Sequence, residues 1–102
     1  RKKTLQCQFE DLTIEPRKKW DKKWRLVILN IPRNRQKARF DFRLKLNKLD
    51  FYKLQQNVFV YPYECKKEIE FIADVLNIKH FVTIGETLPF DGDNFIKRKF
   101  GI

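Results

Sequence analysis

The residue types that enzymes use most often for catalysis are scarce in this chain. His80 is the single histidine, and no cysteine, serine or second histidine stands near it in the sequence. Cys7 and Cys65 form no CxxC pair, so the ligands of a zinc site are lacking, although a disulfide between the two is allowed. A nearby helix N-terminus can lower a thiol pKa, but Cys65 has no paired base. We therefore expect His80 at the surface, Cys65 packed and unreactive, and no metal or cofactor.

The net charge of +10 lies almost entirely in the first half of the chain. Residues 1–53 contain 17 Lys or Arg and 6 Asp or Glu, whereas residues 54–102 contain 6 and 7. Such an excess attracts polyanions such as nucleic acids, although it can also be a solvated face that only keeps a small protein in solution. The side chains that we predict to contact nucleic acid are Lys18, Lys19, Lys22, Lys23, Arg25, Arg33, Arg35 and Arg39.

Two further groups of side chains have both a chemical and a structural interpretation. Trp20 and Trp24 stand among lysines and arginines, where rings can stack on bases, but large aromatic residues beside a buried strand are more often packed. Asp91, Asp93 and Asn94 resemble part of a calcium loop, yet the bidentate Glu of such a loop is missing. We expect packing for the tryptophans, and a turn with a helix cap for the acidic cluster.

Composition limits the fold to one small domain. The chain has 102 residues, of which 42% are hydrophobic and 15% aromatic, so it can form a real but small core. No apolar run approaches the roughly 20 residues that a membrane span requires, and no signal peptide is visible. We therefore expect a soluble, cytoplasmic protein without membrane contact.

Apolar spacing predicts a helix and then a central strand in the first third of the chain. Leu5, Phe9 and Leu12 fall at helical intervals, and the proline after Glu15 should end this helix. Residues 24–31 form a near-continuous apolar run with several β-branched side chains. That pattern is typical of a strand buried on both faces at the centre of a sheet.

Residues 35–49 are ambiguous between strand and helix. The apolar residues between positions 40 and 46 alternate as in a strand, but four apolar residues also share one stripe of a helix. The length of the segment and its content of Arg, Lys and Leu favour the helix. Phe40 and Leu44 then face away from the stripe, so they need a second partner surface or are exposed. The stripe consists of Ala38, Phe42, Leu46 and Leu49.

The second half of the chain is predicted to contain three strands and two helices. Residues 51–54 and 58–61 are strands joined by a turn at Asn57, and residues 81–84 are the last strand. The helix at residues 64–76 has its inner face at Ile69, Ile72, Ala73 and Leu76. The tail can hold a short helix that begins near Asp93 or Asn94 and is held by Phe95, Ile96 and Phe100.

The order of these elements predicts the fold class. Strand, helix, strand, strand, helix and strand make an α+β, ferredoxin-like βαββαβ fold, with a four-stranded antiparallel sheet and two helices on one face. We divide the chain into an N-terminal helix and linker (residues 1–19), the ferredoxin-like domain (20–85) and a C-terminal tail (86–102). This fold serves many functions and does not by itself indicate one.

Two blocks, a tryptophan-rich basic stretch that leads into an apolar run and a later aromatic hairpin, resemble a known family. They are similar to the central and C-terminal domain of PaaX-like transcriptional repressors, a domain that is itself similar to the CRISPR-associated endonuclease family Cas two. The resemblance covers about residues 17–85. It rests on Trp20-Asp21-Lys22-Lys23-Trp24-Arg25, Val27-Ile28-Leu29-Asn30-Ile31-Pro32, Lys37-Ala38-Arg39 and residues 51–65, FYKLQQNVFVYPYEC.

The resemblance implies a homodimer and a preceding module. In PaaX-like proteins such a domain follows an N-terminal winged helix, and residues 1–14 would be the end of that module. Because the first residue is Arg, we expect the natural N-terminus to lie upstream. A homodimer also suits a small open sheet, whose edges and apolar residues such as Phe59, Phe81 and Phe95 need cover.

The nuclease relatives end their first strand with an Asp that binds a divalent metal at the dimer axis. The matching residue here is Asn30. Mg²⁺ prefers charged oxygen ligands, so two facing Asn30 amides would leave the charge of the metal uncompensated. We therefore expect no catalytic residue and no metal-dependent cleavage. Asn30 should instead be a strand-end residue whose side chain hydrogen-bonds the following turn.

These observations support two hypotheses from different classes. The first is a non-enzymatic dimerisation domain of a PaaX-like transcriptional regulator, which contacts the phosphates of DNA or RNA without reading sequence. The alternative is a CRISPR-associated endonuclease that uses Mg²⁺, or a structural subunit of the spacer-integration complex with an integrase as its partner. A winged helix in the same chain would favour the regulator, and an adjacent integrase gene would favour the alternative.

Overall fold

A computed structural model describes residues 5–14 and 19–102, with side chains from residue 8 onward. Within these ranges the chain forms a sheet, helices and two short 3₁₀ turns, η1 and η2. The strands are β1 (Trp24–Leu29), β2 (Tyr52–Gln55), β3 (Val58–Tyr61) and β4 (Val82–Thr87). The helices and turns are α1 (Leu5–Asp11), η1 (Arg33–Arg35), α2 (Gln36–Lys48), α3 (Lys66–Val75), η2 (Lys79–Phe81) and α4 (Asn94–Phe100).

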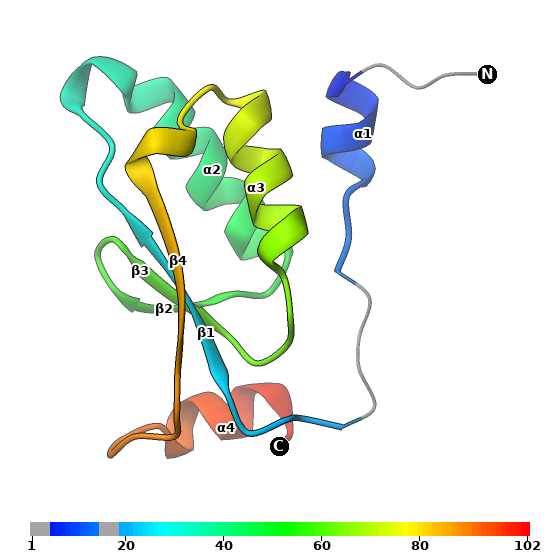
Figure 1. The fold of residues 1–102 in the computed structure, drawn as a ribbon, viewed down its shortest axis with the longest axis vertical. Helices are drawn as coiled ribbons and strands as arrows, with labels where there is room; N and C mark the ends of the chain where they lie inside the picture. Colours follow the sequence, from blue (N-terminus) through cyan, green and yellow to red (C-terminus); the bar gives the residue numbers. More distant parts are fainter. Residues whose placement is uncertain (1–4, 15–18) are drawn as a thin grey trace.

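The sheet has the predicted ferredoxin-like order. Its strands are arranged β2-β3-β1-β4, and every neighbouring pair is antiparallel. α2 connects β1 to β2 and α3 connects β3 to β4, and the two helices lie side by side against the same face of the sheet (Figure 1). The predicted α+β class and the central place of β1 are therefore confirmed.

The main core lies between the sheet and these two helices. Side chains alternate across a strand, so Val27 and Leu29 of β1 and Phe59 of β3 point toward the helices. Phe42 of α2 and Ile72 of α3 pack against them, and each of these five side chains is at most 3% exposed. Burying one such side chain stabilises the fold by about 1.5–3 kcal/mol. The predicted inner faces of both helices are thus confirmed.

α2 confirms the helical interpretation of the ambiguous segment. Phe42 and Leu46, at the centre of the predicted stripe, are fully buried. Phe40 and Leu44 lie on the opposite side of the helix and are 64% and 43% exposed. The prediction that these two residues face away from the core is correct, and most of the Phe40 side chain is open to solvent.

The ends of two helices differ from the prediction. α3 begins at Lys66 rather than at Glu64, because the Glu64 carboxylate stays outside the helix and accepts a hydrogen bond from the Lys66 amide (3.0 Å). α1 ends at Asp11, before the proline that was expected to end it. Local contacts at the helix ends therefore decide both boundaries.

Lys45 explains the early end of α1 and was not predicted from the sequence. Its ammonium group donates hydrogen bonds to the carbonyls of Glu10 (3.2 Å) and Leu12 (3.1 Å) and lies 5.5 Å from the ring centre of Phe9. Only 5% of Lys45 is exposed, and this burial lowers the pKa of its ammonium group. Lys45 thus satisfies carbonyls at the C-terminal end of α1, which lies beside α3 (Figure 1).

Strand boundaries differ by a few residues because pairing partners and turns decide them. β1 ends at Leu29 rather than at residue 31. β2 begins one residue late, because Phe51 is buried in the core instead of pairing. Phe81 belongs to η2 rather than to β4, and β4 continues to Thr87 because that residue still pairs with β1.

Within the described chain, the second face of the sheet is covered at one end only. Trp24 and Val60 are fully buried there and pack against Ile96 of α4. Further along β1 on the same face, Ile28 is 38% exposed. The prediction that β1 is buried on both faces is wrong at the end of the strand that contains Ile28, because α4 has only 7 residues and does not reach Ile28.

The tail forms the predicted short helix, with different contacts. Ile96 is buried and Phe100 is partly buried, but Phe95 is 69% exposed and does not hold the helix in place. Asp93 precedes α4 without capping it, because its carboxylate accepts hydrogen bonds from the Trp24 indole (2.9 Å) and the Phe90 amide. Phe59, which was expected to need cover from a second copy, is buried within the single chain.

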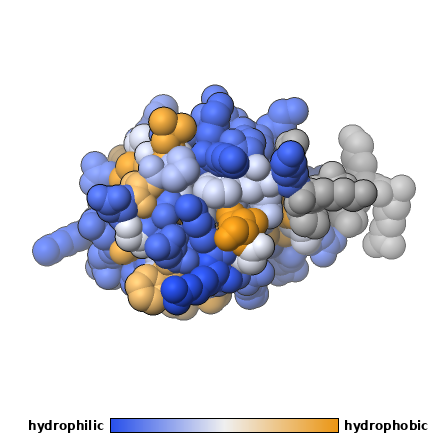
Figure 2. All heavy atoms as spheres, turned by 90° about the horizontal axis from the view of Figure 1, so that it is seen from below, coloured by the Kyte–Doolittle hydropathy of each residue, from blue (hydrophilic) through white to orange (hydrophobic). Residues whose placement is uncertain are grey.

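The surface at the end of the molecule that carries α4 is largely hydrophilic. Hydrophobic patches on it are small and separate (Figure 2). None of the helices in the described part of the chain has the length and apolar character needed to cross a membrane.

Candidate nucleic-acid interface

The first group of predicted cations lies in the segment that leads into β1. Lys19, Lys22 and Lys23 are exposed there, whereas Lys18 lies outside the described residues. Lys22 has a left-handed backbone (φ 64°), which costs a non-glycine residue roughly 1 kcal/mol. The Asp21 carboxylate stabilises this turn by accepting a hydrogen bond from the Lys23 amide (3.1 Å). The turn therefore holds three lysines in solvent next to the sheet.

Arg25, also predicted to contact nucleic acid, is inside the protein. It is 6% exposed, and its guanidinium forms two hydrogen bonds with Asp21 (2.8 and 2.6 Å) and one with the carbonyl of Pro62 (2.8 Å). Glu64 and Glu86 lie 3.9 and 3.7 Å away. Arg25 is therefore not part of the candidate interface, because it is buried and its charge is balanced by carboxylates of the same chain.

This buried arginine also sets the electrostatics around it. The hydrogen bonds from Arg25 lower the pKa of Asp21 to about 2, and the same bonds raise the pKa of Arg25. Arg25 Nε is buried and has no hydrogen-bond partner among the described residues, although Glu86 is close. The sequence offered no direct sign of this role, because an arginine in a basic stretch resembles its exposed neighbours.

The second group of predicted cations begins in η1. Arg33 is exposed, but Arg35 donates a hydrogen bond to the carbonyl of Asn77 (2.6 Å) and lies 5.9 Å from the ring centre of Phe81. Asn77 follows the end of α3, so Arg35 satisfies a carbonyl at that helix end. Arg35 thus links η1 to the end of α3, whereas the side chain of Arg33 is exposed to solvent.

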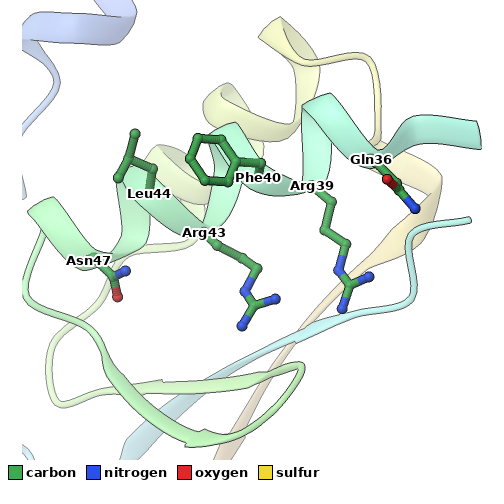
Figure 3. A pocket seen from close by; sticks show the side chains of 6 residues that line it. All are labelled: Gln36, Arg39, Phe40, Arg43, Leu44 and Asn47. Atoms are coloured by element: carbon green, nitrogen blue, oxygen red, sulfur yellow. The ribbon is translucent and has the colours of Figure 1, made fainter. Parts of the chain in front are cut away.

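Arg39 lies on the outer face of α2 together with a second arginine, Arg43. The Arg39 guanidinium donates a hydrogen bond to the Asn57 side chain in the β2–β3 turn (3.3 Å), which holds it in place. The two arginines extend from α2 toward the β2–β3 hairpin (Figure 3). They line an open pocket of about 570 Å³, whose other lining residues are Gln36, Phe40, Leu44 and Asn47.

We call these six residues the α2 outer face. Arg43, Phe40 and Leu44 were not predicted as site residues. Their spacing contained the signal, because Arg39 and Arg43 are four positions apart, as are Phe40 and Leu44, and such pairs are neighbours on a helix. From the sequence, Phe40 and Leu44 were identified only as residues that face away from the core stripe.

The two tryptophans near the basic segment are packed, as predicted. Trp24 is fully buried, and the ring of Trp20 lies against it with a centroid distance of 4.6 Å. The Trp20 indole donates a hydrogen bond to the Lys23 carbonyl (2.9 Å). The hydrogen bond from Trp24 also lowers the pKa of Asp93. The ring of Trp24 is therefore closed to solvent, and the partly exposed ring of Trp20 has Trp24 packed against it.

The remaining titratable candidates have structural positions. Cys65 is fully buried at the start of α3, and burial raises the pKa of its thiol to about 12. It is a free thiol packed in the core, as expected, and its pKa is raised rather than lowered. His80 is exposed in η2, close to the strand entry where it was predicted.

Comparison with known proteins identifies the family of this domain. Residues 17–94 match the family model described as the PaaX protein central Cas2-like domain. The chain belongs to this family. The match ends at the first residue of α4, so it covers the sheet, α2 and α3 but neither α1 nor most of α4. Searches of curated proteins and of solved structures found no significant match.

This PaaX-family domain lacks the donors for a divalent metal at the end of β1. Asn30 directly follows β1, and its amide N–H donates to the carbonyl of Phe81 (2.8 Å). The predicted side-chain hydrogen bond to the following turn is not formed within the described chain. In residues 8–14 and 19–102, no three His, Cys, Asp or Glu side chains are placed to share a metal ion. The uncharged amide of Asn30 is a poor ligand for Mg²⁺, and the absence of a metal and the lack of cleavage both stay predictions.

Proposed function

We propose that this domain acts as a non-enzymatic, nucleic-acid-associated homodimer within a PaaX-like transcriptional regulator. The observation that carries the nucleic-acid part is the charge of η1 and α2. Residues 33–43 contain five Lys or Arg and one Asp. That acid, Asp41, is already paired with Lys37 (3.3 Å) on the same helix. The arginines of this stretch are therefore not neutralised by it.

Arg39 and Arg43 have the chemistry that phosphate binding requires. A guanidinium group is planar, permanently charged and able to donate two parallel hydrogen bonds to one phosphate. Contacts of this kind hold a nucleic-acid backbone without reading its sequence. In this proposal a winged helix elsewhere in the regulator reads the operator, and the α2 outer face adds affinity and fixes the position of the duplex.

The test measures how salt changes duplex affinity. Fluorescence anisotropy with a labelled duplex of mixed sequence should give a dissociation constant that rises steeply with salt. Each phosphate contact contributes about −0.9 to the slope of log affinity against log salt. Replacing Arg39 and Arg43 together by Gln should therefore flatten the slope by about 2 units.

The matched control removes two charges from the other helix. Lys66 and Lys67 are exposed on α3, so Lys66→Gln with Lys67→Gln changes the net charge by the same amount. This control should leave the slope within error of the parent protein. A parent slope near zero, or equal flattening by both double variants, would show that the basic surface is only solvated.

The dimer in this proposal uses the open face of the sheet, which we define by Leu26 and Ile28 of β1 and Val58 of β3. Ile28 and Val58 are paired neighbours in the sheet register, and Ile28 is 38% exposed. Two copies that place these faces together would bury apolar surface that α4 leaves uncovered. A stable interface of standard size buries roughly 800 Å² on each partner.

Light scattering at micromolar concentration tests the dimer. The parent protein should have twice the chain mass, and Ile28→Glu should have the mass of one chain, because two carboxylates would be buried face to face. Leu44→Glu is the control, since Leu44 is similarly exposed (43%) but lies on α2. A monomeric parent, or a mass that responds to Leu44→Glu alone, would contradict this interface.

A further inference from the structure

The α2 outer face contains more than phosphate contacts require. Phe40 is 64% exposed, and Leu44 beside it is 43% exposed. Phosphate binding needs cations and amides, and it gains nothing from an exposed aromatic ring. Exposure alone does not indicate a ligand, since Phe95 on α4 is exposed to a similar degree (69%). What distinguishes Phe40 is that it shares one pocket with Leu44 and two arginines, which suits a ligand with an apolar surface as well as negative charge.

The pocket around this ring defines the chemistry of that ligand. Its lining combines one aromatic ring, one leucine, two arginines and two side-chain amides, Gln36 and Asn47. Among the described residues, no acidic side chain lines it. Phe40 and Leu44 lie along the helix, while Arg39 and Arg43 extend to one side of them (Figure 3). A flat apolar group can thus be held on the ring while anionic groups meet the arginines.

We propose that the α2 outer face binds single-stranded nucleic acid, with an unpaired base stacked on Phe40 and the phosphates of the same strand held by Arg39 and Arg43. This inference rests on the proposed phosphate contacts and adds the class of ligand. Aromatic rings in basic grooves bind single strands because every base has a flat π face. Gln36 and Asn47 offer donors and acceptors to base edges.

An acidic protein segment is the competing occupant, and the composition disfavours it. A helix bound in a groove needs a row of apolar contacts at spacings of three and four residues. The pocket offers only Phe40 and Leu44, and its other four residues carry planar polar groups. Alternating flat bases and charged phosphates match this pattern better. A duplex shields its base faces, so the ring should distinguish single strands from duplexes.

The experiment compares three labelled probes by fluorescence anisotropy: an oligothymidylate, an abasic strand of the same length and charge, and a mixed-sequence duplex. Phe40→Ala should weaken oligothymidylate binding about tenfold. It should leave binding of the abasic strand and of the duplex unchanged. Phe40→Trp should restore oligothymidylate binding, because the indole also offers a flat ring.

Phe95→Ala is the matched control, because Phe95 is 69% exposed beside Arg98 but lies on α4. It should leave binding of all three probes unchanged. An equal loss for Phe40→Ala and Phe95→Ala would overturn the proposal, and so would a loss on Phe40→Ala that is the same for abasic and base-bearing strands.

Three other outcomes show whether this inference, the proposed function or both are overturned. If no probe binds the parent protein, the phosphate contacts themselves are refuted and both proposals fall. If the duplex binds with a steep salt dependence and Phe40→Ala weakens no probe, only the stacking inference is overturned. A Phe40→Ala protein that loses half its mass in light scattering would show that the ring contacts another copy of the chain, which also overturns stacking.

Discussion

α2 and α3 occupy equivalent places on one face of the sheet, but their outer surfaces differ. Each helix buries its inner stripe, represented by Phe42 and Ile72, in the same core. In the described chain, large exposed hydrophobic side chains occur on α2, at Phe40 and Leu44, and none occurs on α3. Since the fold needs only the inner stripes, the outer surface of α2 is free to serve binding.

The largest expected effect tests whether the inner stripes of α2 and α3 contribute similarly to the unfolding free energy. Phe42→Ala should cost about 3–5 kcal/mol of unfolding free energy, and Ile72→Ala about 2–5 kcal/mol, because each change leaves a cavity in the core. Urea unfolding followed by circular dichroism measures both values. A loss below about 1 kcal/mol on one helix would mean that this helix does not share the core as described.

An intermediate effect concerns the residues that precede the two helices. α2 begins at the exposed Gln36, whereas α3 directly follows Cys65, whose thiol is buried and has a pKa raised from 9.0 to about 12. Because the folded pKa is the higher one, this stabilisation is complete below pH 9 and decreases as the pH rises toward 12. The decrease should be at most about 1.4 kcal/mol per pH unit.

Comparing the parent protein with Cys65→Ala isolates this contribution. Unfolding free energies measured below and above pH 9 should show a steeper decline for the parent, since the cavity in the variant is independent of pH. Equal slopes for both proteins would mean that the thiol ionises as easily in the folded chain as in the unfolded one.

The smallest expected effect sharpens the contrast between the two sides of α2. Phe40→Ser should change the unfolding free energy by no more than about 0.5 kcal/mol, because the ring makes few contacts in the folded domain. Measured beside Phe42→Ala, it compares two phenylalanines of one helix. A loss similar to that of Phe42→Ala would show that something in the protein covers the ring of Phe40.

Local patterns in the sequence predicted much of the fold. The period of apolar residues decided between helix and strand for α2 and correctly assigned Phe42 to the core. The order of elements predicted the sheet, and charge counting located the basic region. Element ends were less accurate, since they depend on contacts such as the hydrogen bond from the Lys66 amide to the Glu64 carboxylate at the start of α3.

The candidate site was predicted only in part. Arg33 is exposed and Arg39 is half-buried with a hydrogen bond to Asn57, whereas Arg25 is buried and Arg35 holds the end of α3. Arg43 was missed, although it stands one helical turn after Arg39. Nothing in the local sequence distinguishes an arginine that pairs within the chain from one that faces solvent, because the partners come from other elements.

The sequence by itself determined which residues share a face, since the helical and strand periods are properties of neighbouring residues. Only the tertiary structure decided which faces are covered and which cations are free. The Trp24 indole finds the Asp93 carboxylate 69 residues away, and Lys45 meets the end of α1 35 residues before it. Which residues become such partners depends on the tertiary packing of the whole chain, so a local sequence pattern does not predict them.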